Sequence, residues 1–421
     1  MDDASTGTLS IDRILHHGSH RQLLRRISAS NVPGTRVDAI VVPAARSVES
    51  LGNALALATD LSCGVIVLCS GNVTATEAAV AGNAAKVSLI ALDVGGEDYG
   101  LPQFETKKVP SRFARPSDTS LKRNLGLVVA KVAGLERLLF LDDDIVGITR
   151  SGARAAAALA EWFDAVGLEN KGYPDNSVVC HTYRELEEGG QQQFIGVGAL
   201  AVDARSNPSF FPNIYNQDWM FMLGSGPWPR LAVTGRMKQV AYDPFADPDR
   251  ARREEFGDCI GEGLYWLLDE GVSIERADSE HWTDFLKRRS YFIQHLIARV
   301  EAGGYEKSWG ERVLDSLQLA QETNAKVTPE TCLDFVQRWR ADLGTWREFI
   351  AQLPADLGVA KALEHLGWPG VVQSERPWPA VASLGEDRLI FPNGRACVAD
   401  QQADRPSDRS GETSPFAPAA T

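Results

Sequence analysis

The sequence has no apolar run long enough to cross a membrane, no apolar signal-peptide core behind its acidic start, and no internal repeat. Its six cysteines are scattered, and they form neither a C-x-x-C pair nor a zinc-type cluster with histidine. These absences predict a soluble protein without a transmembrane segment, in a reducing and therefore cytoplasmic compartment.

Positive charge is also scarce. The chain has 43 Lys and Arg against 56 Asp and Glu, so its formal net charge is −13. This balance argues against nucleic acid or an anionic membrane as a partner, although a local basic groove for phosphates stays compatible with it. A length of 421 residues with 44% hydrophobic composition suits one large globular domain with an accessory part, or two domains.

Apolar runs and alanine-rich segments alternate from residue 36 to residue 141. Strands are predicted at 37–42, 64–69, 87–92 and 137–141, with helices at 51–61, 74–83 and 120–133 between them. This alternation predicts an α/β fold with a doubly wound, mainly parallel sheet. Ligands of such sheets bind at the carboxyl ends of the strands, so the residues after each strand should line one crevice.

The rest of the chain divides by composition. Residues 1–35 are predicted to form an N-terminal helical extension, with a helix at 11–27 whose solvated basic face carries His20. The α/β domain is predicted over 36–275, with further strands at 177–180, 194–202 and 237–242. A helical C-terminal region follows over 276–368, and the tail at 369–421, rich in Pro, Ser and Asp, is predicted to be largely disordered.

The stretch 138–145 is the strongest chemical signal. Four apolar residues end in Asp142-Asp143-Asp144, and an apolar residue follows. A buried run of this kind is typical of a central strand, and unpaired carboxylates at its end cannot stay buried. They must face a crevice, a cation or both, and Mg²⁺ or Mn²⁺ prefers such oxygen ligands. The alternative is a strand end whose surplus acids cap the next helix.

Several segments together resemble the GT-A fold of nucleotide-sugar-dependent glycosyltransferases. Besides the acidic strand end, Lys122-Arg123-Asn124 resembles an Arg-Asn-x-Gly segment, and 196–200 resembles a small-residue strand on the acceptor side. Gln217-Asp218 resembles the acidic dipeptide whose second acid is the catalytic base in inverting members. The resemblance covers about residues 36–270, and it departs from the family at 70–72, which has no acid, and at Gln217.

The resemblance implies a site for a nucleoside-diphosphate sugar. Asp142 and Asp144 would hold Mg²⁺ or Mn²⁺ against the diphosphate, His281 would be a third metal ligand, and Asp218 would be the base. The residues expected to contact the donor are Pro43, Arg46, Ser70, Asp93, Lys122, Arg123, Asn124 and Asp143. Structural roles stay open for these residues: Lys122 and Arg123 as charges at a helix start, Asp218 as a helix N-terminal acid, and His281 as a packed histidine.

Two other functions are compatible with the same acids. Asp142 to Asp144 also resembles the strand-end motif of haloacid-dehalogenase-type phosphohydrolases, where the first acid is a nucleophile, but that motif normally follows the first strand. A non-catalytic nucleotide-sugar-binding protein is the second alternative. The sequence does not indicate the donor, the small-molecule or glycan acceptor, the stereochemistry or the oligomeric state.

Overall fold

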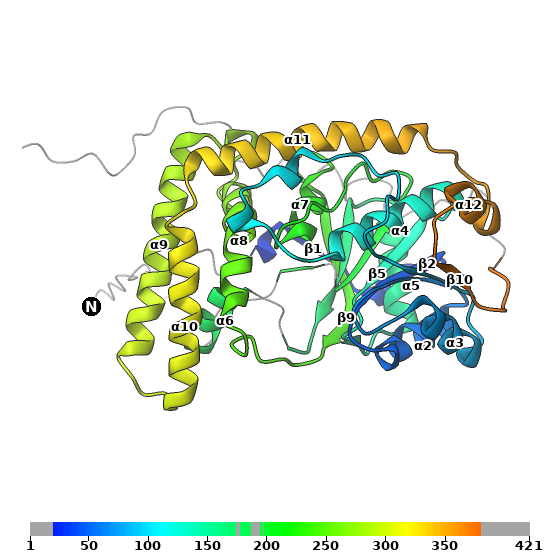
Figure 1. The fold of residues 1–421 in the computed structure, drawn as a ribbon, viewed down its shortest axis with the longest axis horizontal. Helices are drawn as coiled ribbons and strands as arrows, with labels where there is room; N and C mark the ends of the chain where they lie inside the picture. The colour runs from blue at the N-terminus through cyan, green and yellow to red at the C-terminus, as the bar shows by residue number, and fades with distance from the viewer. Residues whose placement is uncertain (1–19, 174–176, 187–193, 197, 380–421) are drawn as a thin grey trace, which may run out of the picture. The chain divides into compact units, whose positions relative to one another are not determined.

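The computed structural model describes residues 20–173, 177–186, 194–196 and 198–379. Within these ranges ten strands form one sheet in the order β1-β9-β7-β8-β5-β2-β3-β4-β10, with β6 paired to β9 off this path (Figure 1). The strands are β1 (Leu24–Arg26), β2 (Ala39–Ala44), β3 (Gly64–Cys69), β4 (Leu89–Asp93), β5 (Arg137–Leu141), β6 (Ile145–Val146), β7 (Ala165–Asn170), β8 (Ala199–Asp203), β9 (Leu231–Gln239) and β10 (Val371–Gln373).

The sheet is mixed but mostly parallel, which confirms the α/β prediction at this level. Strands β2, β3, β4 and β5 are parallel to one another, and β7, β9 and β1 form a second parallel group. Strand β8 joins the groups because it is antiparallel to both β5 and β7. Strands β5 and β7 therefore run the same way, and their carboxyl ends lie at the same edge of the sheet.

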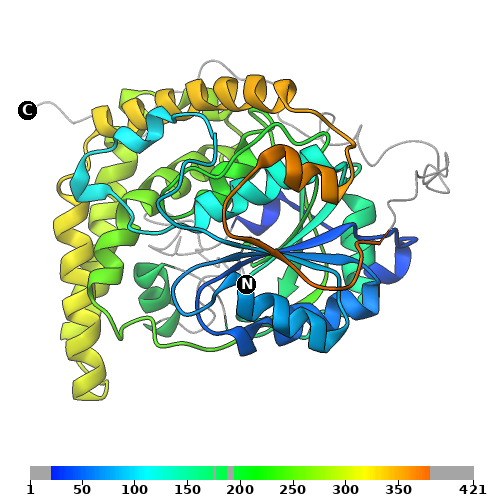
Figure 2. The same ribbon diagram turned by 45° about the vertical axis from the view of Figure 1, so that its right-hand side comes forward.

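Helices cover both faces of this sheet. The helices are α2 (Gly52–Leu61), α3 (Ala75–Ala85), α4 (Thr119–Ala133), α5 (Arg150–Leu159), α6 (Val178–Leu186), α7 (Gln217–Leu223), α8 (Asp249–Asp269), α9 (Ser279–Glu301), α10 (Lys307–Asn324), α11 (Pro329–Gln352) and α12 (Val359–Leu366). Helices α2, α3 and α5 pack on one face, while α4 covers the other and carries α12 (Figure 2). Every residue of β3 and β5 is buried, as expected for central strands covered on both sides.

Local sequence signals set several helix ends. The Thr74 hydroxyl accepts from the Glu77 backbone N–H, and the Glu77 carboxylate accepts from the Thr74 N–H, which forms a capping box at the start of α3. Gly134 ends α4 with a φ of 78°, a left-handed conformation that glycine adopts without strain. The capping box thus sets where α3 begins, and Gly134 sets where α4 ends.

The C-terminal part of the described chain is helical, from α9 to α12. Helix α10 packs on α8 and α9, and α11 packs on α9. The buried apolar cluster of the sheet continues into α11, where Trp346 lies against Phe104 and Phe210. Among the described residues, no helix combines the length and the apolar character that crossing a membrane requires.

The structure corrects several local predictions. The described part of the predicted helix at 11–27 is instead a short 3₁₀ turn, Arg21–Leu23, followed by β1, which adds to the edge of β9. Residues 177–180, predicted as a strand, belong mostly to α6, and β7 was not predicted at all. The start of the predicted tail forms β10 on β4, while 380–421 lie outside the described residues. In each case pairing or packing across the fold outweighs the local pattern.

Candidate functional site

A cavity of about 510 Å³ opens at the carboxyl ends of β2 and β5. These strands are neighbours, and the chain extends from β2 toward β3 and β4 on one side and from β5 toward β8 on the other. Open α/β sheets bind ligands where the strand order reverses in this way. The cavity therefore lies where the topology places a ligand.

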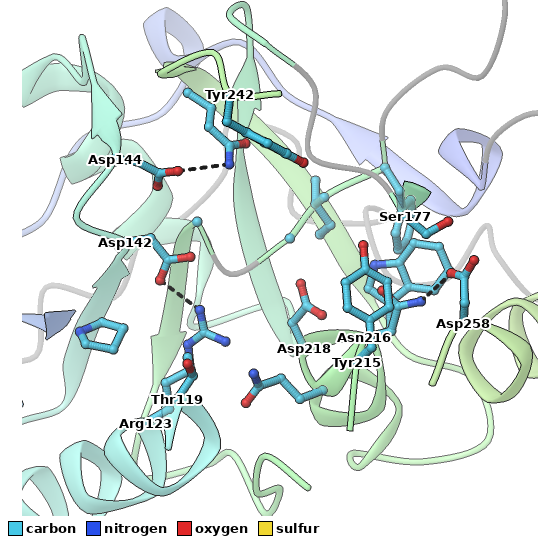
Figure 3. A pocket seen from close by; sticks show the side chains of 18 of the residues that line it. Thr119, Arg123, Asp142, Asp144, Ser177, Tyr215, Asn216, Asp218, Tyr242 and Asp258 are labelled. Atoms are coloured by element: carbon cyan, nitrogen blue, oxygen red, sulfur yellow. Dashed lines mark hydrogen bonds and ion pairs between the residues drawn. The ribbon is translucent and has the colours of Figure 1, made fainter. Parts of the chain in front are cut away.

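The three predicted acids line the cavity, and each has a defined partner. Figure 3 shows Asp142 and Asp144 at its wall. The Arg123 Nη2 donates to Asp142 Oδ1 at 2.7 Å. Asp143 accepts from the backbone N–H groups of Ala45 and Arg46 at 3.2 and 3.3 Å, which ties the end of β5 to the loop after β2. Asp144 Oδ2 accepts from Arg46 Nη2 at 2.9 Å and from the Gln239 amide at 3.1 Å.

Asp142 and Asp144 suit a divalent cation chemically. In the described part of the chain, Asp142 Oδ2 and Asp144 Oδ1 take no hydrogen bond, so each carboxylate keeps one oxygen for a metal. Burial and then the charge of Asp142 raise the pKa of Asp144, which a bound cation would oppose. The described residues contain no group of three or more His, Cys, Asp or Glu side chains placed to hold a metal. A site built on two carboxylates would therefore use substrate phosphates as further ligands, as Mg²⁺ sites commonly do.

Asp218 lies in the first turn of α7, and its carboxylate points into the cavity across from Asp142 (Figure 3). Gly196 runs close beside it, since a Cβ built at that position would lie 3.0 Å from Asp218 Oδ2. Asn216 precedes α7 in a left-handed conformation and donates through Nδ2 to Asp258 Oδ1 at 2.9 Å. This hydrogen bond from Asn216 to α8 holds the start of α7 in place, and it therefore also holds Asp218 in place.

Helix α8 approaches this turn at a glycine. A Cβ built at Gly257 would lie only 2.3 Å from the Tyr215 carbonyl oxygen, so a larger residue there would push the turn away. Buried ion pairs next to Gly257 support this contact between α8 and the turn. Arg289 of α9 donates through Nη2 to Glu255 at 2.8 Å and to Asp258 at 2.6 Å. The chain of contacts Arg289–Asp258–Asn216 therefore connects the helical region with the turn that carries Asp218.

His20 is a cavity residue that the sequence did not identify as one. Its Nδ1 lies 2.5 Å from Asp269 Oδ2 and its Nε2 lies 3.1 Å from Glu262 Oε2, and the ring meets Trp219 edge-on with the centroids 5.0 Å apart. Burial works against the charged form, but the charge of Glu262 and the hydrogen bonds to Asp269 and Glu262 outweigh it and raise the pKa of His20 to about 10. His20 is therefore a buried imidazolium between two carboxylates of α8.

We expect the free energy of unfolding to fall as pH rises from 6.5 to 10. Because the pKa of His20 rises on folding from 6.5 to about 10, its stabilisation is complete below pH 6.5 and is lost as pH rises through 10. At about 1.36 kcal/mol per pKa unit, the limit is of the order of 5 kcal/mol. Urea unfolding of the wild type and His20→Gln at several pH values measures this, and an equal decline in both would contradict the assignment.

The cavity brings together most of the predicted site. Seven of the predicted residues line it: Pro43, Arg46, Arg123, Asp142, Asp143, Asp144 and Asp218. They come from the ends of β2 and β5 and from α4 and α7. The agreement for the strand ends follows directly from the parallel topology, because all these strands end at one edge.

Four residues predicted to contact a donor hold the fold instead and do not line the cavity. Lys122 is buried, and its Nζ donates to Ser70 Oγ at 2.6 Å and to the Ala44 carbonyl at 2.9 Å; burial lowers its pKa. Asp93 accepts from the Ala75 N–H at the start of α3, at 2.6 Å. Asn124 exchanges two hydrogen bonds with the backbone of Phe211, at 2.8 and 2.9 Å.

The structure does not bring His281 to the acids. Its Nε2 lies 2.9 Å from the Gly263 carbonyl oxygen, in the contact between α9 and α8, and burial lowers its pKa. The prediction of a third metal ligand at His281 therefore has no support in its position, and a packing role accounts for it. The pattern Ser279-Glu280-His281-Trp282 begins α9, with Asp278 as the N-terminal cap.

Further cavity residues come from segments that carry no motif. Arg250 donates to Glu254 at 2.6 Å and to the Tyr242 hydroxyl at 3.0 Å, and Arg115 donates to the Ile214 carbonyl at 3.1 Å. Glu254 is buried, and this burial raises its pKa to about 7 even though Arg250 opposes the shift. A single arginine in a loop, such as Arg115, gives no sequence signal, because its role depends on which elements the fold places opposite it.

Sequence comparison with known proteins assigns the chain to no family. A scan against models of protein families gives no match, and no curated protein matches the chain.

Proposed function

We propose that this protein is a metal-dependent glycosyltransferase that moves a sugar from a nucleoside-diphosphate sugar to an acceptor. One observation carries the proposal: Asp142 and Asp144 at the strand-order reversal share a single cavity with Asp218, which comes from a separate helix. Sugar transfer needs both a place for the diphosphate and a base near the acceptor. The resemblance to GT-A enzymes in the sequence assigns the same residues to the same tasks.

The diphosphate of the donor would lie at Asp142 and Asp144 beside the two arginines that now pair with them. Mg²⁺ or Mn²⁺ held by these carboxylates would supply positive charge to the leaving diphosphate. The Arg46 side chain is 57% exposed, so it can leave Asp144 for a phosphate at little cost in packing. Arg123 is buried against Asp142 and presents a fixed cation on the other side. These groups oppose the negative charge that develops on the leaving group.

Asp218 is the proposed base. It would take the proton from the acceptor hydroxyl as that oxygen attacks the sugar carbon, and the bond to the diphosphate breaks. The turn 215–217 and the Arg289–Asp258–Asn216 contacts hold it in place. Its position across the cavity from Asp142 leaves the donor sugar between the base and the diphosphate (Figure 3).

Replacing Asp218 by asparagine is expected to lower kcat about 10²- to 10⁴-fold, the usual range for loss of a general base. The KM for the donor should change little, since Asp218 lies away from the proposed diphosphate position. The matched control is Asp249→Asn, because Asp249 also stands in the first turn of a helix but does not line the cavity. Equal kcat for Asp218→Asn and the wild type would exclude the base assignment.

The test of the function is incubation with a panel of nucleoside-diphosphate sugars, with and without Mn²⁺, followed by detection of the released nucleoside diphosphate. Metal-dependent release from one donor supports the proposal. Metal-dependent binding with no release from any donor would indicate a binding protein. Turnover of generic phosphate esters that is lost in Asp142→Asn would instead indicate a phosphohydrolase, and the transferase proposal would fail.

A further inference from the structure

A second, smaller cavity of about 260 Å³ lies at the carboxyl end of β7. Its walls come from β1, the end of β7, α6 and the segment before β8. The apolar part of the lining is Leu24, Phe194, Ile195 and Val233, and the polar part is mostly cationic. Because β5 and β7 run the same way, this cavity opens at the same edge of the sheet as the acids.

The cavity concentrates positive charge on an acidic chain. Four cationic side chains line it: Arg21, Arg26, Lys171 and Arg184. Glu169 is the one carboxylate among the described lining residues. Glu169 Oε1 pairs with Arg26 Nη2 at 2.9 Å and with Arg21 at 3.3 Å, and its Oε2 pairs with Lys171 at 2.9 Å. One carboxylate thus serves three cations. Among the described lining residues, four positive charges against one negative give an excess of three, on a protein whose formal net charge is −13.

Arg184 is the cation that Glu169 does not neutralise. In the part of the chain that the structure describes, its guanidinium forms no ion pair and lies 6.0 Å from the centre of the Tyr173 ring. An exposed guanidinium with donors to spare, beside two further arginines, suits an oxyanion with several acceptor oxygens. A phosphate dianion matches this excess charge better than a single carboxylate does.

The two cavities adjoin. Phe194 and Ile195 line both of them. A hydrogen-bonded bridge also connects their walls: the Gln239 backbone N–H donates to Asn170 Oδ1 at 3.2 Å, and the Gln239 side chain donates to Asp144. A volume of about 260 Å³ lies below the roughly 300–1,000 Å³ of a complete ligand site, so it suits one end of a ligand whose other end reaches the larger cavity.

We propose that this second cavity is an anion-binding subsite that takes the phosphate group of a small phosphorylated ligand. The identity of the ligand rests on the proposed function: the ligand is the acceptor. Arg26, Lys171 and Arg184 bind its phosphate, and its hydroxyl lies toward Asp218. The apolar wall formed by Phe194 and Ile195 contacts the carbon atoms between the two groups. Phosphate binding itself does not depend on the identity of the reaction.

Calorimetric titration of the full chain with inorganic phosphate, without metal, tests the subsite. Arg26→Gln is expected to weaken phosphate binding at least threefold, and the double variant Arg26→Gln/Arg184→Gln at least tenfold. Glu169→Gln should tighten it several-fold, because the competing carboxylate is removed. The matched control is Arg312→Gln: Arg312 is 46% exposed and pairs with Asp243, as Arg26 is 48% exposed and pairs with Glu169. Its phosphate affinity should equal that of the wild type.

Three results would overturn the subsite. One is phosphate affinity that is unchanged in the double variant, and another is weaker binding in Glu169→Gln, which would mean that the acid supports the anion. The third is phosphate binding that disappears in Arg46→Gln while the double variant retains it, because the anion would then occupy the larger cavity. Acetate binding as tight as phosphate would contradict the choice of a dianion.

The same measurements separate this inference from the proposed function. Phosphate affinity that follows the expected order, together with no binding of any nucleoside-diphosphate sugar, would keep the subsite and reject the transferase. Donor turnover, together with a phosphate affinity that is unchanged by replacement of Arg26, Glu169 and Arg184, would support the transferase and reject the subsite.

Discussion

Replacing Asp144 by asparagine is expected to abolish metal-dependent donor binding and to lower kcat for sugar transfer at least about a hundredfold, since charge stabilisation of this kind is commonly worth several kcal/mol. Asparagine keeps the size of the side chain and can still accept from Gln239, but it carries no charge to hold a divalent cation or to pair with Arg46. The measurement is kcat and donor Kd as functions of Mn²⁺ concentration.

Asp93→Asn is the matched control for Asp144→Asn. Asp93 also ends a parallel strand, but it accepts from the Ala75 N–H at the start of α3 and does not line the cavity. Its replacement should leave metal dependence and kcat within about twofold of the wild type. Equal losses in the two variants would mean that the effect is on folding and not on the site.

Replacing Arg289 by methionine is expected to lower the free energy of unfolding by about 3–5 kcal/mol, the usual cost of breaking a buried ion pair from one side. Glu255 and Asp258 would then be left buried without their cation, and both side chains are almost fully buried. Asp258 also fixes Asn216 ahead of α7, so the variant that remains folded should lose activity as well. Urea unfolding and kcat measure the two effects.

Lys287→Met, on the exposed side of the same helix, provides the comparison. Lys287 forms no ion pair in the described residues, so its replacement should change the free energy of unfolding by no more than about 0.5 kcal/mol. If Arg289→Met is no less stable than Lys287→Met, the buried pairs do not support the turn that carries Asp218.

The part of the fold that the sequence predicts best is the part built by consecutive units. Strands β3 and β5 have the predicted bounds, and the acids at 142–144 lie at the predicted edge. In these segments the apolar run, the turn residues and the helix caps agree with one another, and parallel pairing brings the strand ends together without further information.

The misses share a physical cause, which is contact between segments distant in the chain. The basic segment near His20 reads as an amphipathic helix, but β1 pairs with β9, and His20 meets Glu262 and Asp269 of α8. The resemblance also suggested Lys122 as a donor contact, but its Nζ donates to Ser70 Oγ and to the Ala44 carbonyl. Neither arrangement follows from local pattern, because both depend on which elements pack face to face.

The resemblance to GT-A enzymes suggested Asp218, which lines the cavity together with the acids, and it also suggested His281, which does not line the cavity. His281 binds the Gly263 carbonyl at the α8–α9 contact, where a histidine fills a packing position. The cations of the second cavity form no motif in the sequence, since Arg21 and Arg26, Lys171, and Arg184 come from three separate places in the chain. Clusters assembled by folding in this way are visible only in the structure.

The most direct test of the central claim is calorimetric titration of nucleoside-diphosphate sugars into the protein with and without Mn²⁺, in the wild type and in Asp142→Asn/Asp144→Asn. If the proposed function holds, we expect one donor to bind at least about tenfold tighter with Mn²⁺, and the double variant to lose this gain while its urea unfolding stays cooperative. Donor affinity that is independent of Mn²⁺, or equally dependent on it in the folded double variant, would contradict the assignment of Asp142 and Asp144 as the metal site.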